Sequence, residues 1–179
     1  MRLFADGRLS GAQYVPSPNA DERPPGMAVE LLVIHSISLP PGEFGGRGIV
    51  DLFMNRLDPD GHAAYRELNG LRVSAHFLIR RGGEIVQFVP SAKRAWHAGV
   101  SNWRGRERCN DFSVGIELEG TDTAAFEEAQ YRKLAELSKL LKQAYPVRDV
   151  VGHSDIAPGR KTDPGSCFDW ERYRADIES

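Results

Sequence analysis

The segment Leu31-Leu32-Val33-Ile34-His35 decides the fold of this chain, because it is a clear strand that ends on a chemically active side chain. Its four consecutive apolar residues have the length of a strand and fall far short of a membrane span. The loop that follows, residues 39–48, is dense in proline and glycine. Loops of this length in a compact domain often bind ligands or close over them, so we predict a mobile lid.

Outward from this strand, apolar runs and turn residues predict a mixture of strands and helices. Further strands are expected at residues 73–79, 84–89, 112–118 and 147–152, the first two joined as a hairpin by Arg80-Arg81-Gly82-Gly83. Three- and four-residue spacing predicts helices over 49–56, from 121–124 to 145, and over 168–177. Residues 58–69, 95–111 and 153–165 are predicted as loops.

This order of elements predicts an α/β fold: a single domain over residues 1–179, with a mixed central β-sheet flanked by helices. Residues 15–26 are rich in proline and polar groups, so we expect residues 1–28 to form an N-terminal arm packed on that domain.

Composition narrows the class of protein. The formal net charge is −2 and 41% of the residues are hydrophobic, values typical of a globular protein without a preference for nucleic acid or an anionic membrane. The N-terminus lacks the apolar core of a signal peptide, and two cysteines, Cys109 and Cys167, are too few for a disulfide-rich secreted domain. We expect two reduced thiols and a cytoplasmic monomer.

Polar residues stand where apolar strands would otherwise continue. His35 and His153 each follow a strand directly, and Glu117 lies inside Ser113-Val114-Gly115-Ile116-Glu117-Leu118-Glu119. Because ligand sites in α/β sheets gather beyond strand ends, these residues are candidates for one site.

Two histidines and a nearby acid make a plausible zinc site with one position left for water. Asp163 is the favoured acid, since its loop can curl back to the metal, whereas Asp155 is only two residues from His153. Asp155 could instead orient a histidine ligand, and His97 is a further candidate ligand or a substrate contact. Spacing alone leaves a structural role for these histidines equally open.

Glu117 is the candidate general base, with Glu119 as a rival and a structural ion pair to an arginine as the alternative. Lys161, close to Asp163, could stabilise a developing oxyanion or simply be a surface lysine. We expect Trp96 and Trp103 to stack on a sugar or to join the core, His62 to be exposed, and His76 to be buried and hydrogen-bonded.

Five runs along the chain resemble the cytosolic AmpD amidases: residues 32–42, 74–79, 95–99, 109–120 and 152–165. That family hydrolyses 1,6-anhydro-N-acetylmuramyl peptides and shares its fold with phage lysozyme-type amidases and peptidoglycan recognition proteins. The likeness extends from about residue 14 to about residue 174.

The resemblance implies one zinc ion held by His35, His153 and Asp163, with Glu117 activating water and Lys161 stabilising the tetrahedral intermediate. It implies substrate contacts from Ser36, Arg72, Ala95, Trp96, His97 and Arg108, where the arginines would meet carboxylates of the stem peptide. The implied partners are small soluble anhydro-muropeptides, and the implied role is peptidoglycan recycling and, through muropeptide levels, β-lactamase regulation.

This sequence departs from the family at Ser36, where asparagine is common, so a contact to the peptide could be lost or bridged by water. Two other functions fit the same fold: an amidase of polymeric peptidoglycan, which normally requires export, and a non-catalytic muropeptide receptor, which normally lacks a complete ligand set.

Overall fold

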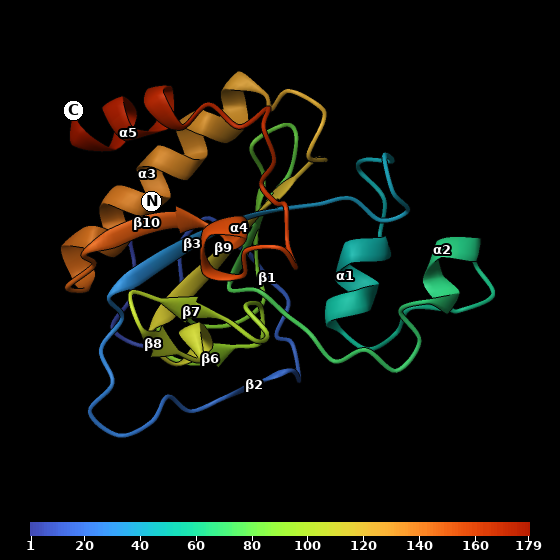
Figure 1. The fold of residues 1–179 in the computed structure, drawn as a ribbon, viewed down its shortest axis with the longest axis horizontal. Coiled ribbons are helices and arrows are strands. Elements are labelled where there is room, and N and C mark those ends of the chain that lie inside the picture. The colour runs from blue at the N-terminus through green and yellow to red at the C-terminus, as the bar shows by residue number, and fades with distance from the viewer.

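The computed structural model describes residues 1–179, and a six-stranded sheet lies at its centre (Figure 1). The strands, in spatial order, are β1 (Gln13–Tyr14), β5 (Ile85–Gln87), β4 (Phe77–Ile79), β9 (Ser113–Glu119), β3 (Leu31–Ile37) and β10 (Asp149–Gly152). The β4–β5 pair is antiparallel and every other neighbouring pair is parallel. The predicted single-domain α/β fold with a mixed sheet is confirmed.

Alternation along β3 assigns the two faces of the sheet. Leu32 and Ile34 belong to the largest apolar cluster, which includes buried residues of α3 (Glu128–Ala144) and α5 (Trp170–Glu178). These two helices lie side by side at one side of the molecule in Figure 1. Leu31 and Val33 join a different cluster. Because side chains alternate along a strand, His35 shares the face of Leu31 and Val33, away from α3.

The long helix begins later than the sequence pattern predicted. Residues 121–127 precede α3 rather than opening it, and the capping contacts lie at Glu127, whose N–H donates to Oε1 of Gln130 at 3.0 Å. The earlier residues have other partners: the Phe126 side chain is buried, and the Asp122 carboxylate accepts from Ser36 at 3.1 Å. The predicted end at Tyr145 is confirmed by its position as C-cap.

The helix predicted over 49–56 is α1 (Gly48–Phe53) and stops three residues earlier than predicted. Asn55 has a φ of 58°, a left-handed conformation that ends a helix. The predicted loop 58–69 contains one turn of helix, α2 (Ala63–Arg66), where the exposed His62 caps the helix by accepting from the N–H of Ala64 at 3.1 Å.

The predicted loop 95–111 is more ordered than expected. It contains a small hairpin, β7 (Asn102–Trp103) and β8 (Arg106–Glu107), and the 3₁₀ turn Cys109–Asp111. Arg104 and Gly105 connect the hairpin with φ values of 51° and 83°, the left-handed pair that a tight two-residue turn requires. The predicted loop 153–165 opens with the short helix α4 (His153–Ile156).

The first 28 residues supply β1 and also β2 (Ala20–Asp21), which pairs with β6 (Arg94–Ala95). The Arg23 guanidinium is inserted between the carbonyls of Asn110, Ser91 and Ser113. Cys109 and Cys167 are free thiols. None of the helices combines the length and the apolar character needed to cross a membrane.

Candidate active site

Three parallel strands bring the candidate residues to one edge of the sheet. The Cα partner of His35 on β3 is Glu117 on β9, and the partner of Ile34 is Gly152 on β10. His153, which follows Gly152, therefore emerges beside His35. Since parallel strands end at the same edge, residues 118 positions apart meet without any distortion of the chain.

His35, His153 and Asp163 converge on one point. The Nδ1 atoms of the two histidines lie 3.0 Å apart, and each lies 3.1 Å from Oδ2 of Asp163. Both histidines are buried and Asp163 is partly buried. Asp155 is outside this cluster; its carboxylate accepts from the N–H of Gly152 at 2.7 Å and so supports the start of α4. His97 is also outside it.

The electrostatics of the cluster favour an anionic aspartate beside a neutral His35. Burial lowers the pKa of His35 to about 4, because it penalises the imidazolium more than the nearby Asp163 stabilises it. Burial alone would raise the pKa of Asp163, but its close contacts with the His153 and His35 rings outweigh this effect and lower that pKa below its usual range. These are the protonation states that metal ligands need.

The far nitrogen of each histidine is hydrogen-bonded. Nε2 of His153 lies 3.1 Å from the carbonyl oxygen of Ala98, which can only accept, so the proton of a neutral ring sits on Nε2 and Nδ1 carries a lone pair. Nε2 of His35 lies 2.9 Å from Nδ1 of His97. Partners of this kind fix the orientation of metal-binding imidazoles.

The trio fits a zinc ion by donor chemistry and by size. Donors about 2.0–2.1 Å from a tetrahedral zinc lie about 3.3 Å from one another, close to the 3.0–3.1 Å separations seen here. Two imidazoles, one carboxylate and an open fourth position are the ligand set of a catalytic zinc site rather than a structural one.

Glu117 and Glu119, the two rivals for the base, have different surroundings. Both oxygens of Glu119 accept hydrogen bonds, from the Arg80 side chain and the Gly45 N–H at 2.8 Å and from the Arg81 N–H at 3.3 Å. Glu119 therefore forms the structural ion pair. Glu117 is 8% exposed, and its Oε2 atom is buried without a partner.

Burial raises the pKa of Glu117 well above its usual value; the negative charge of Asp163 adds to this effect and Lys161 opposes it. A carboxylate with a raised pKa and a free oxygen next to a metal cluster is suited to proton transfer. Glu117, Lys161 and the trio line one cavity of about 210 Å³, which also contains Ser36 and His97. Among these residues Lys161 is exposed to solvent.

Ser36 is engaged within the protein. Its hydroxyl donates to Oδ1 of Asp122 at 3.1 Å, and Oδ2 of the same carboxylate accepts from Thr162. The serine thus helps to tie the end of β3 to the loop that carries Asp163.

The other predicted substrate contacts lie outside the cavity that His35, His153 and Asp163 line. Arg72 is exposed and lines a neighbouring cavity of about 150 Å³, whereas Ala95 is fully buried in β6 and has only backbone groups to offer. The Trp96 N–H donates to the Ser74 hydroxyl and the Trp96 carbonyl accepts from the Ser74 N–H, both at 3.1 Å. The indole Nε1 of Trp96 is buried without a partner.

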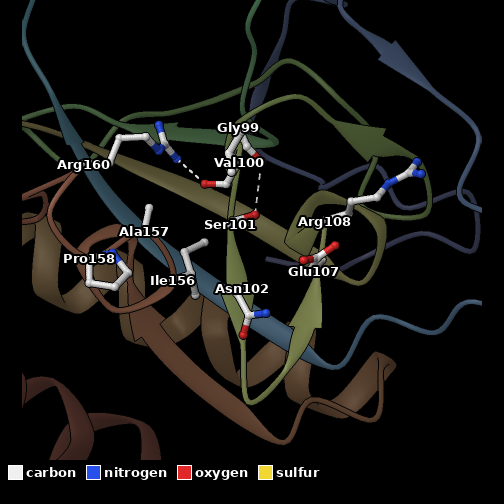
Figure 2. A pocket seen from close by; sticks show the side chains of 10 residues that line it. All are labelled: Gly99, Val100, Ser101, Asn102, Glu107, Arg108, Ile156, Ala157, Pro158 and Arg160. Carbon is white, nitrogen blue, oxygen red and sulfur yellow. Dashed lines mark hydrogen bonds between the residues drawn. The ribbon is translucent and has the colours of Figure 1, made fainter.

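Arg108 lines a larger cavity of about 500 Å³ beside the hairpin β7–β8 (Figure 2). Arg160, on the opposite wall, donates at 2.7 Å to the carbonyls of Ala98 and Val100. The Ala98 carbonyl also contacts His153, so Arg160 in the wall of this cavity and a candidate metal ligand share one hydrogen-bond acceptor.

Several residues that shape the site were missed by the sequence analysis. Asn110 Oδ1 accepts from the N–H groups of His97 and Ala98 at 3.0 and 2.8 Å, which fixes the segment behind the histidines. Ser113 Oγ lies 3.1 Å from Nε2 of His97. The available signal was two small residues, Ser113 and Gly115, that alternate with the apolar Val114 and Ile116 in this strand.

Comparison with known proteins shows the family to which the chain belongs. Residues 25–166 match the family model described as N-acetylmuramoyl-L-alanine amidase. The 1,6-anhydro-N-acetylmuramyl-L-alanine amidase AmpD of Escherichia coli K12 is 59% identical over 174 residues, which cover 96% of this chain and 95% of that protein.

Two solved structures extend the comparison. The crystal structure of a selenomethionine AmpD derivative superposes with a TM-score of 0.96 at 57% identity, covering 98% of this chain and 99% of that one. The complex of the amidase AmiD of E. coli with anhydro-N-acetylmuramic acid-L-Ala-D-γ-Glu-L-Lys has a TM-score of 0.61 at 34% identity. The match covers 83% of this chain and 57% of the AmiD chain. The chain belongs to the N-acetylmuramoyl-L-alanine amidase family and is similar to AmpD along nearly its whole length.

Proposed function

We propose that this chain is a zinc-dependent amidase that hydrolyses the bond between the lactyl group of 1,6-anhydro-N-acetylmuramic acid and L-alanine in small soluble muropeptides. The observation that carries the proposal is the convergence of His35, His153 and Asp163 beside Glu117, whose buried Oε2 has no partner. The names of the relatives support the anhydro-muropeptide as substrate.

His35, His153 and Asp163 would hold the zinc, which when bound polarises a carbonyl and lowers the pKa of water from about 16 to about 7. Glu117 would accept the proton of the attacking water and deliver it to the departing alanine nitrogen. Lys161 would stabilise the negative charge that develops on the carbonyl oxygen. The cavity that these residues line is where the scissile amide would lie.

Substrate binding would extend from this cavity to Ser36, Trp96 and His97, to the backbone of Ala95, and to Arg72 and Arg108. The two arginines are exposed, and Arg72 has no carboxylate partner in the structure, so its guanidinium is available to a carboxylate of the stem peptide. We further propose that the protein acts as a cytoplasmic monomer in peptidoglycan recycling and, by lowering muropeptide levels, in β-lactamase regulation.

A comparison of two substrates tests the proposal against an amidase of polymeric peptidoglycan. The purified protein is incubated separately with soluble anhydro-muramyl peptides and with whole sacculi, and released peptide is quantified by mass spectrometry. We expect release from the soluble substrate and little from sacculi. Equal rates on sacculi would refute the assignment to small muropeptides, and no release from either would favour the receptor alternative.

A further inference from the structure

Behind the metal cluster, a line of side chains leads from His35 into the sheet. Nε2 of His35 lies 2.9 Å from Nδ1 of His97, and Nε2 of His97 lies 3.1 Å from Oγ of Ser113. All three residues are buried, with 1%, 9% and 0% of their surface exposed. The rings of His35 and His97 meet edge to face at 87°.

The fold makes room for the His97 ring. A Cβ at Gly115 would lie 2.4 Å from Cγ of His97, so any side chain larger than hydrogen at this interior strand position would displace the ring. Asn110 fixes the backbone of the same residue, because its Oδ1 accepts the His97 N–H at 3.0 Å. The ring is therefore held by its backbone, by the strand beneath it and by both of its nitrogens.

Hydrogen-bond direction links Ser113 to the metal face of His35. For His35 to offer a lone pair at Nδ1, its single ring proton must sit on Nε2 and be donated to Nδ1 of His97. His97 must then carry its own proton on Nε2 and donate it to Ser113. In the reverse order, Ser113 donates to His97, His97 donates to His35, and a proton occupies Nδ1 of His35, facing Asp163.

We propose that His97 and Ser113 are positioning residues that hold His35 in the tautomer and orientation required for zinc, with the Ser113 hydroxyl as the acceptor at the end of the line. The inference rests on the zinc of the proposed function. His153 needs no such chain, because its far nitrogen contacts the Ala98 carbonyl, a backbone group that no substitution removes. The orientation of His35, in contrast, depends on the side chains of His97 and Ser113, which substitutions can remove.

Zinc affinity and a cobalt spectrum test the proposal without measuring activity. The full-length protein, Ser113→Ala and the control Ser138→Ala are stripped of metal and titrated with zinc in competition with a chromophoric chelator. Ser138 is a matched control because it is an equally buried serine, bonded to the Tyr173 hydroxyl at 2.6 Å in a separate part of the core. The d–d absorption of the Co²⁺-substituted proteins then reports the ligand geometry.

We expect Ser113→Ala to weaken zinc binding about 10- to 100-fold and to alter the Co²⁺ spectrum, the loss typical of an outer-shell partner. Ser138→Ala should do neither. In a His97→Ala background, the Ser113→Ala change should cost little more, because the two residues act in series.

Parent-like zinc affinity and spectrum in Ser113→Ala, an equal loss in Ser138→Ala, or full additivity of the Ser113 and His97 effects would each overturn the proposal. A parent protein that binds no zinc would instead refute the proposed function, and this inference with it.

Discussion

His35 and Glu117 are direct partners in the register of two neighbouring parallel strands, β3 and β9. The candidate metal ligand His35 and the candidate base Glu117 therefore lie on adjacent hydrogen-bonded strands rather than on a flexible loop. Sites built on strands hold their geometry more tightly than sites built on loops. Asp163 and Lys161, in contrast, come from the segment after α4 and complete the site from the side.

Replacing Glu117 by glutamine should separate proton transfer from folding and metal binding. We expect Glu117→Gln to lower kcat by about 10²- to 10⁴-fold, the usual contribution of a general base. Its zinc content should match the parent, and its unfolding free energy should be equal or higher, since an amide avoids the cost of an unpaired buried carboxylate. A variant with parental kcat would remove Glu117 from the mechanism.

Replacing Glu119 by glutamine should have the opposite effect: a loss of stability without a loss of kcat. Glu119→Gln should weaken the ion pair with Arg80 and lower the unfolding free energy by about 1–3 kcal/mol. Its kcat should stay near the parental value, because both Glu119 oxygens already accept hydrogen bonds, one from Gly45 in the loop 39–48 and one from Arg81 in the β4–β5 turn. Urea denaturation and steady-state kinetics measure the two effects; a large fall in kcat at unchanged stability would exchange the roles of the two glutamates.

Lys161→Ala tests oxyanion stabilisation. The side chain is exposed, so its removal should leave the fold intact while lowering kcat by about 10²- to 10³-fold. Lys161→Arg keeps the positive charge and should retain more of the rate. If both variants turned over substrate like the parent, Lys161 would be an ordinary surface lysine.

The buried His76 predicts a pH dependence of stability. Its Nδ1 accepts from the Gly115 N–H and its Nε2 contacts the Lys93 carbonyl, both at 3.0 Å, as the predicted structural role requires. Burial, with a smaller contribution from Arg23, lowers its pKa to about 3 in the folded protein, against about 6.5 in the unfolded chain. Between pH 3 and pH 6.5, His76 therefore binds a proton in the unfolded state but not in the folded state.

The contribution of His76 to stability is complete above pH 6.5 and is lost progressively as the pH falls towards 3. At pH 5 the loss should be about 2 kcal/mol. Urea denaturation of the metal-free protein at pH 7.5 and pH 5 should show a smaller difference for His76→Gln than for the parent. The control His62→Gln, at an exposed residue, should keep the parental difference. Identical pH differences in parent and His76→Gln would contradict this assignment.

The sequence predicted the fold where its signals were local. The apolar run at Leu31–Ile34 predicted β3, and the apolar residues within 112–118 predicted β9. His35, which follows the first run, and His153, which follows β10, lie in the site as expected. The start of α3 was wrong, because a helical pattern continues into residues 121–127 while tertiary contacts of Asp122 and Phe126 hold that segment in another conformation.

The supporting residues of the site could not be predicted in the same way. The contact between His97 and Ser113 joins a loop to a strand, and no periodicity reports it. Sequence position favoured Asp163 over Asp155 but could not show what Asp155 does instead. The turn of helix at 153–156 engages the Asp155 carboxylate with the N–H of Gly152. Which of Glu117 and Glu119 is the candidate base could not be predicted either, because it depends on Arg80. This residue follows β4 and donates a hydrogen bond to Glu119, which leaves Glu117 as the candidate.

The central claim, that a metal held by His35, His153 and Asp163 drives amide hydrolysis, is tested most directly by one chelation experiment. The protein and Asp163→Ala are incubated with an anhydro-muramyl tripeptide, with and without a chelator, and the products are weighed by mass spectrometry. We expect the parent to yield the free sugar and the free tripeptide, chelation to stop this and added zinc to restore it, and Asp163→Ala to be inactive throughout. Full hydrolysis by the chelated parent, or by Asp163→Ala without bound zinc, would contradict the account.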